Sequence, residues 1–160
     1  MNVIEEIAGE LCKILLPIED RLYFGNPNST IAVCTLSSNK LLKDIANLPL
    51  MNKINVAGRL LSENKGIDQL VRHIISNNNI HTIILCGKDT TGHQPGQSLL
   101  CLHRNGINKN AIIIDSQSPN PVLSLTEEEI LKFQKQVKII NKIGEEDISN
   151  LKLKICENLT

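Results

Sequence analysis

The alternation of short apolar runs with helix-forming segments constrains this chain more than any other feature. Four runs rich in β-branched residues lie at residues 31–36, 54–58, 81–86 and 111–115. Runs that are apolar at nearly every position predict strands buried on both faces, as in parallel sheets covered by helices. We therefore predict an α/β fold, in which an open, mainly parallel sheet carries helices on both faces.

The segments around these runs show the three- and four-residue apolar spacing of amphipathic helices. The predicted helices cover residues 1–16, 40–48, 62–76, 97–105 and 126–140. Ser62 is the expected N-cap of the third helix, Gly106 ends the fourth, and Thr126 opens the fifth with a capping box. Residues 147–159 fit either a helix or an edge strand, and we favour the helix.

The length of 160 residues suits a single domain. A hydrophobic fraction of 41% is enough for a buried core. No internal repeat or low-complexity linker divides the sequence. We expect one unit made of an N-terminal helix at 1–16, an α/β core at 31–141 and a C-terminal helix at 147–159.

The charge balance argues against nucleic acid as a partner. Seventeen Lys and Arg residues offset seventeen Asp and Glu residues, so the chain lacks the positive field that attracts phosphates. One Tyr and two Phe are too few for a base-stacking platform. No run approaches about eighteen apolar residues, and charges interrupt the N-terminal segment, so neither a membrane span nor a signal peptide is expected.

The five cysteines are odd in number and never form a CxxC pair, which indicates neither a disulfide framework nor a zinc site. A reducing, cytoplasmic location fits this usage. Phosphate-loop, GxGxxG, GxSxG and HExxH motifs are also absent from the sequence. Nucleotide binding and hydrolase chemistry therefore have little support.

Ligands of open α/β sheets bind beyond the carboxyl ends of the strands. Four segments follow the predicted strands there: residues 36–38, 57–59, 87–96 and 115–119. From the first, second and fourth of these we take as candidate ligand contacts Leu36, Ser37, Ser38, Gly58 and Asp115.

The third segment is the most unusual, because it gathers three glycines, a proline and a histidine between a strong strand and a strong helix: Gly87, Gly92, His93, Pro95 and Gly96. Glycine is used where the backbone approaches a ligand closely or adopts positive φ. The segment is also longer than the two to six residues of an ordinary connection. A lone loop histidine is more often solvated or turn-capping, so His93 stays open between that role and binding a metal or flat ligand. We interpret the other histidines as structural: His73, His81 and His103.

This loop and its surroundings resemble a known family. The matching residues are Ile31–Leu36, Glu63–Ile67, Ile74–Asn77, Asn79–Ile80, Ile84–Gly87, Gly92–His93, Gly96–Gln97 and Phe133–Gln136. From about Pro17 to Cys156 the chain resembles the A subunit of the methanogen tetrahydromethanopterin S-methyltransferase. The GHxxGQ loop is the most specific element of the match.

The resemblance implies a Rossmann-like domain that holds a cobamide such as cobalamin, which takes a methyl group from N5-methyl-tetrahydromethanopterin on Co(I) and passes it to coenzyme M. The motif histidine of the family is associated with the lower axial side of cobalt and maps onto His93. The remaining loop contacts expected for the cofactor are Gly87, Asp89, Gly92, Gln94, Pro95, Gly96 and Gln97. The cofactor carries the chemistry, so no catalytic residue independent of it is expected.

A ligating imidazole usually donates its other N–H to a carboxylate or carbonyl, which fixes the tautomer. Asp89 and Asp115 are the candidate partners of His93. Asp89 is slightly preferred, since the resembling family carries an acid near that place. Capping the following turn is an equally good role for Asp115.

As a carrier, the protein would work with partner methyltransferase subunits and would not be a complete enzyme alone. The alternative is a corrinoid storage or regulatory module without turnover. The resembling protein carries a transmembrane helix after its soluble domain, and no such segment follows here. We accordingly expect a soluble, cytoplasmic homologue, and sodium translocation is not expected of this chain.

Overall fold

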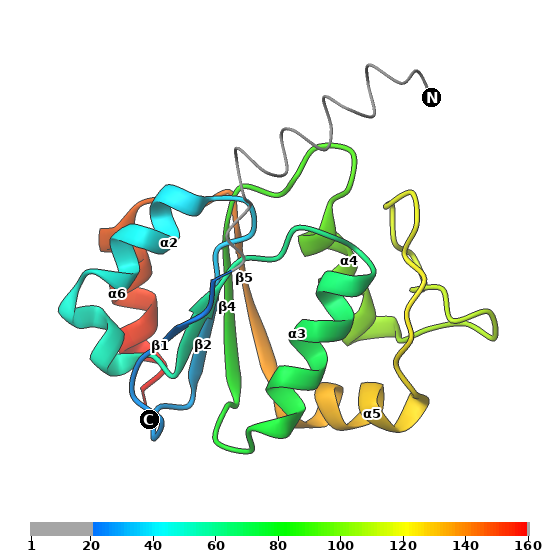
Figure 1. Ribbon diagram of the computed structural model, residues 1–160, viewed down its shortest axis with the longest axis horizontal. Coiled ribbons are helices and arrows are strands. Elements are labelled where there is room, and N and C mark those ends of the chain that lie inside the picture. Colours follow the sequence, from blue (N-terminus) through cyan, green and yellow to red (C-terminus); the bar gives the residue numbers. More distant parts are fainter. Residues whose placement is uncertain (1–20, 160) are drawn as a thin grey trace.

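The alternation of strands and helices is present in the computed structural model, which describes residues 21–159 (Figure 1). In chain order the elements are β1 (Tyr23–Phe24), β2 (Ile31–Cys34), α2 (Asn39–Ala46), the 3₁₀ helix η1 (Pro49–Lys53), β3 (Val56–Gly58), α3 (Lys65–Ser76), β4 (Thr82–Gly87), α4 (Pro95–Asn105), α5 (Glu127–Gln136), β5 (Lys138–Ile143) and α6 (Ile148–Glu157). The helix expected at residues 1–16 lies outside the described residues.

The strands form one sheet in the order β1-β3-β2-β4-β5. β2 pairs in parallel with β3 on one side and β4 on the other, and β4 pairs in parallel with β5. The short edge strand β1 runs antiparallel to β3. The predicted α/β class with a mainly parallel sheet is therefore confirmed.

Helices cover both faces of the sheet (Figure 1). On one face α3, α4 and α5 bury a cluster that includes Ile67, Leu102 and Phe133. On the other, α2, η1 and α6 pack against a second cluster that includes Ile45 and Ile155. β4 is buried at every position, as the prediction of a strand covered on both sides requires.

The predicted strand at 111–115 is wrong. This segment makes isolated antiparallel bridges, Ile107 with Ile113 and Ile112 with Val122, and does not join the sheet. Ala111 and Asp115 have φ angles of 60° and 65°, which bend the chain at both ends of the apolar run. Residues 106–125 instead form an excursion beside α3 and α4.

The helix predicted for 126–140 is too long. It opens with the expected capping box of Thr126 and Glu129, but α5 ends at Gln136 and the chain continues as β5. Ile139 pairs with Ile83 at the edge of the sheet. The helical spacing of Val137 and Ile140 after Phe133 is coincidental, because the parallel sheet takes up these residues.

Smaller boundaries also move. α3 begins at Lys65 with Asn64 as its N-cap, and Ser62 accepts a hydrogen bond from the Gly66 N–H in its first turn. α4 begins at Pro95 and ends before Gly106, whose φ is 72°. The C-terminal segment is helical, as favoured, with Asp147 capping α6. Within residues 21–159, no helix has both the length and the apolar character needed to cross a membrane.

Candidate functional site

The loop between β4 and α4 holds His93 at the carboxyl end of the sheet (Figure 1). A turn places it there, because the backbone N–H groups of His93 and Gln94 both donate to the Thr90 carbonyl. Gln94 then adopts a left-handed conformation, with φ 44°, just before α4 begins. The His93 side chain is 58% exposed, so a large part of the imidazole faces solvent.

A buried carboxylate orients this imidazole. His93 Nδ1 lies 3.1 Å from Glu63 Oε2 and 3.4 Å from Glu63 Oε1. The Glu63 side chain is 3% exposed, and its Oε1 also accepts a hydrogen bond from the Asn120 backbone N–H at 3.2 Å. A neutral imidazole that donates from Nδ1 to a carboxylate keeps its lone pair on Nε2. Among the described residues, nothing hydrogen-bonds to His93 Nε2.

The carboxylate beside His93 is therefore neither of the two that we expected. Asp89 accepts from the backbone N–H groups of Gly96 and Gln97 at 2.9 and 3.0 Å, so it caps the first turn of α4. Asp115 accepts from the Asn105 side-chain amide at 2.9 Å.

Glu63 was missed because it lies thirty residues before His93, in the loop between β3 and α3. The signal that could have found it is its place in the Glu63–Ile67 match to the family. In isolation, an acid between Ser62 and Asn64 indicates helix capping.

A group of serines fixes the backbone of the loop. The Ser118 hydroxyl donates to the His93 carbonyl and also lies 3.3 Å from the Gln94 carbonyl. Ser98, fully buried in α4, lies 2.5 Å from Ser118 and 2.7 Å from Ser116. Residues 115–120 thus reach the site as predicted, although they follow an irregular segment and not a sheet strand. Their contribution is to support the loop and, through Asn120, to hold Glu63.

The other candidate contacts divide into three groups. Ser37 and Ser38 hydrogen-bond to the backbone of Lys88, and together with Leu36 and Gly87 they form the base of the loop. Gln97 binds the Asp115 carbonyl and the Gln117 N–H, while Pro95 and Gly96 are buried in α4. Gly58 lines a separate cavity beside α3.

Gly92 lies next to His93 in open space. A Cβ built on it would meet no atom within 4 Å. The imidazole edge is therefore free of side-chain bulk on that side, which leaves room for a large flat ligand.

The residues support one kind of metal site. Within residues 21–159, no three His, Cys, Asp or Glu side chains gather into a group that could hold a metal ion by themselves. A single imidazole can still supply one axial ligand to a metal whose other ligands belong to a macrocycle. His93, with its proton held on Nδ1 by Glu63, has the chemistry of such a ligand.

Comparisons with known proteins identify relatives over most of the chain. The family model for the A subunit of tetrahydromethanopterin S-methyltransferase matches residues 16–160. The chain is 37% identical over 135 residues to the A subunit numbered 1 of this enzyme from Methanothermobacter marburgensis, an alignment that covers 83% of the chain and 55% of the relative. The corresponding Methanosphaera stadtmanae protein is 38% identical over 144 residues, covering 88% of the chain and 56% of the relative. The chain thus spans about half the length of the curated relatives it matches.

Proposed function

Because the chain belongs to the family of the tetrahydromethanopterin S-methyltransferase A subunit, we propose that it binds a cobamide at the Gly92–Gln97 loop, with His93 on the lower axial side of cobalt. In this role the protein carries a methyl group from N5-methyl-tetrahydromethanopterin toward coenzyme M, together with partner methyltransferase subunits. When bound, the cobamide supplies the cobalt that accepts and releases the methyl group.

The arrangement of His93 and Glu63 is the observation that carries this proposal. A corrin ring brings four nitrogen ligands of its own, so the protein needs to offer one more donor and not a cluster. The donor offered is an exposed imidazole whose Nδ1 is bonded to a buried carboxylate and whose Nε2 has no hydrogen bond among the described residues. The open flank at Gly92 suits the approach of a broad macrocycle. The residues present therefore fit a cobamide.

The surrounding residues determine how firmly His93 can act. Glu63 keeps the proton on Nδ1 and raises the basicity of Nε2. Ser118 and Asp89 fix the backbone on either side of His93, the former through the His93 carbonyl and the latter through the first turn of α4. The imidazole can thus move toward or away from a bound ligand by side-chain rotation, while its loop stays anchored.

The test is uptake of cobalamin by the purified protein, followed by visible absorption. We expect stoichiometric binding and a spectrum that changes in His93→Ala, because the axial nitrogen is lost. His81→Ala is the matched control, since His81 is an exposed histidine just before β4, at the opposite end of the sheet. An unchanged spectrum in His93→Ala would contradict axial ligation.

A second experiment separates a carrier from a storage or regulatory module. Protein loaded with reduced cobalamin is mixed with N5-methyl-tetrahydromethanopterin and the partner subunits. Transfer of the methyl group to the bound cofactor supports the carrier role. Tight binding without transfer would favour the storage or regulatory module.

A further inference from the structure

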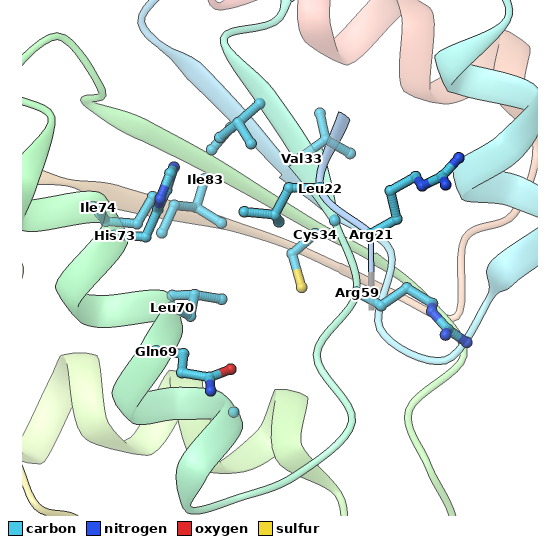
Figure 2. A pocket seen from close by; sticks show the side chains of 14 residues that line it. Arg21, Leu22, Val33, Cys34, Arg59, Gln69, Leu70, His73, Ile74 and Ile83 are labelled. Atoms are coloured by element: carbon cyan, nitrogen blue, oxygen red, sulfur yellow. The ribbon is translucent and has the colours of Figure 1, made fainter. Parts of the chain in front are cut away.

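A second feature at the carboxyl end of the sheet is a cavity of about 230 Å³ between α3 and the strands β2 and β3 (Figure 2). Its floor is formed by Ala32, Cys34 and Val56, and its wall on the helix side by residues of α3 that include Leu70 and His73. Leu22, just before β1, closes the opposite side. None of these residues belongs to the His93 loop.

The cavity is apolar and contains one unsatisfied polar atom. His73 Nε2 is buried and has no hydrogen-bond partner among the described residues. A buried polar atom without a partner costs stability, so a ligand atom that bonds to it would be favoured. Burial raises the pKa of the Cys34 thiol to about 12, so the floor stays uncharged at neutral pH.

The cavity and His93 lie on two sides of the same connection. Gly58 and Arg59 line the cavity at the start of the loop between β3 and α3, and Gly66 lines it at the start of α3. Between them, Glu63 holds His93. One ligand that bridges this loop can therefore reach both places.

We propose that the cavity receives the heterocyclic base at the end of the nucleotide tail of the cobamide, while His93 takes the axial position at cobalt. This inference rests on the proposed function. The cavity is smaller than the roughly 300–1,000 Å³ of sites for drug-sized ligands, so it excludes the corrin ring but suits a bicyclic base. His73 Nε2 hydrogen-bonds to a nitrogen of the base or to the ribose attached to it.

The charges beside the cavity match the rest of the tail. A phosphodiester joins the base-bearing ribose to the corrin ring, and it carries one negative charge. Arg21 and Arg59 both line the cavity, on the side away from His73 (Figure 2). Guanidinium groups are well suited to phosphate oxygens.

Equilibrium binding of cobalamin and of cobinamide, which lacks the nucleotide, tests the inference. We expect the wild-type protein to bind cobalamin at least about tenfold more tightly than cobinamide, since burial of an aromatic base adds affinity. Leu22→Trp fills the cavity from its edge, and Leu22 is 44% exposed, so the fold can accept the change. In this variant cobalamin affinity falls to that of cobinamide, while cobinamide affinity stays within about twofold of wild type.

His73→Phe is a second variant that keeps the ring and removes Nε2. It should weaken cobalamin several-fold and leave cobinamide unchanged, with His81→Phe as the matched control. Equal wild-type affinity for the two corrinoids, or a parallel loss of both in Leu22→Trp, would overturn the base site and leave the proposed function intact. Failure of the wild-type protein to bind either corrinoid would instead overturn the proposed function, and this inference with it.

Discussion

A histidine that serves as an axial ligand must present an unprotonated nitrogen to the metal, and Glu63 determines which nitrogen of His93 that is. The carboxylate is buried and reaches Nδ1 at 3.1 Å. A hydrogen bond to a charged group is worth about 1.5–3 kcal/mol, enough to favour one tautomer by about tenfold or more. The free protein is therefore already prepared for a ligand at Nε2.

The tautomer can be measured without any cofactor. Long-range proton–nitrogen correlation spectra at about pH 8.5, above the ordinary imidazole pKa, should show His93 protonated at Nδ1. In Glu63→Gln this preference is lost, because an amide can either accept from Nδ1–H or donate to an unprotonated Nδ1. Asp89→Asn is the control and leaves the His93 signals in place. Protonation of wild-type His93 at Nε2 would refute the role of Glu63.

Two glycines in the loop have the same backbone sign but different surroundings. Gly87 has φ 76°, and a Cβ on it would lie 2.2 Å from the Thr35 carbonyl oxygen. Gly92 has φ 87° and open space. We expect Gly92→Ala to lower the free energy of unfolding by about 1 kcal/mol. Gly87→Ala should cost about 3 kcal/mol or more, since a backbone clash adds to the strain. Urea denaturation of both variants makes the comparison, and equal costs would contradict it.

At the scale of the elements, the capping box of α5 links helix stability to pH. The Thr126 hydroxyl accepts from the Glu129 N–H, and the Glu129 carboxylate accepts from the Thr126 N–H. That backbone hydrogen bond, followed by the Arg72 guanidinium, lowers the pKa of Glu129. A carboxyl group whose pKa is lower in the folded state stabilises above its unfolded pKa of about 4.3, and the contribution is lost as pH falls through the folded value.

We therefore expect Thr126→Ala to lose about 1 kcal/mol of unfolding free energy at neutral pH. Glu129→Gln should lose less than about 1 kcal/mol, and its difference from wild type should shrink below about pH 4. Urea titrations at several pH values measure both effects. The double variant should lose less than the sum, since the two bonds are reciprocal. A Glu129→Gln difference that grows in acid would contradict the assignment.

The elements that sequence could predict are those whose burial is decided locally. β2 and β4 are apolar on both faces, and the loop around His93 is marked by its glycines, so both were identifiable. β5 was not, because its half-exposed pattern gains its meaning from pairing with β4. Gln136 shows the same dependence: its side-chain amide donates to the carbonyls of Ile74, Asn77 and Ile80, at the far end of α3, where α5 stops. Nothing local to residues 126–140 encodes that contact.

At the scale of the molecule, parallel topology explains why half of the site was hidden. The carboxyl ends of β3 and β4 carry loops that meet above the sheet, so Glu63 and His93 become neighbours across thirty residues. Asn120 joins them from the excursion before α5. A strand order is needed before such pairs can be named, and the order β1-β3-β2-β4-β5 is a property of the whole sheet.

The two cores of the sheet should open together, and the cysteines can report on this. Cys34 packs in the core beside α3, whereas Cys86 packs in the core beside α2 and α6. Burial raises the pKa of both thiols, so neither forms the reactive thiolate in the folded state. Cys156 is exposed on α6. In a Cys12→Ser protein, iodoacetamide should label Cys156 first, and Cys34 and Cys86 should then react at one common rate.

That common rate follows from cooperative unfolding, since a sheet shared by both cores cannot lose one of them and keep its strands paired. Mass spectrometry of labelled peptides over time, with and without low concentrations of urea, gives the two rates separately. Urea should accelerate both by the same factor, because both then report on the same global opening. Labelling of Cys34 well ahead of Cys86 would instead show that α3 separates from the sheet on its own. The face that carries the cavity would then be an independent unit of lower stability.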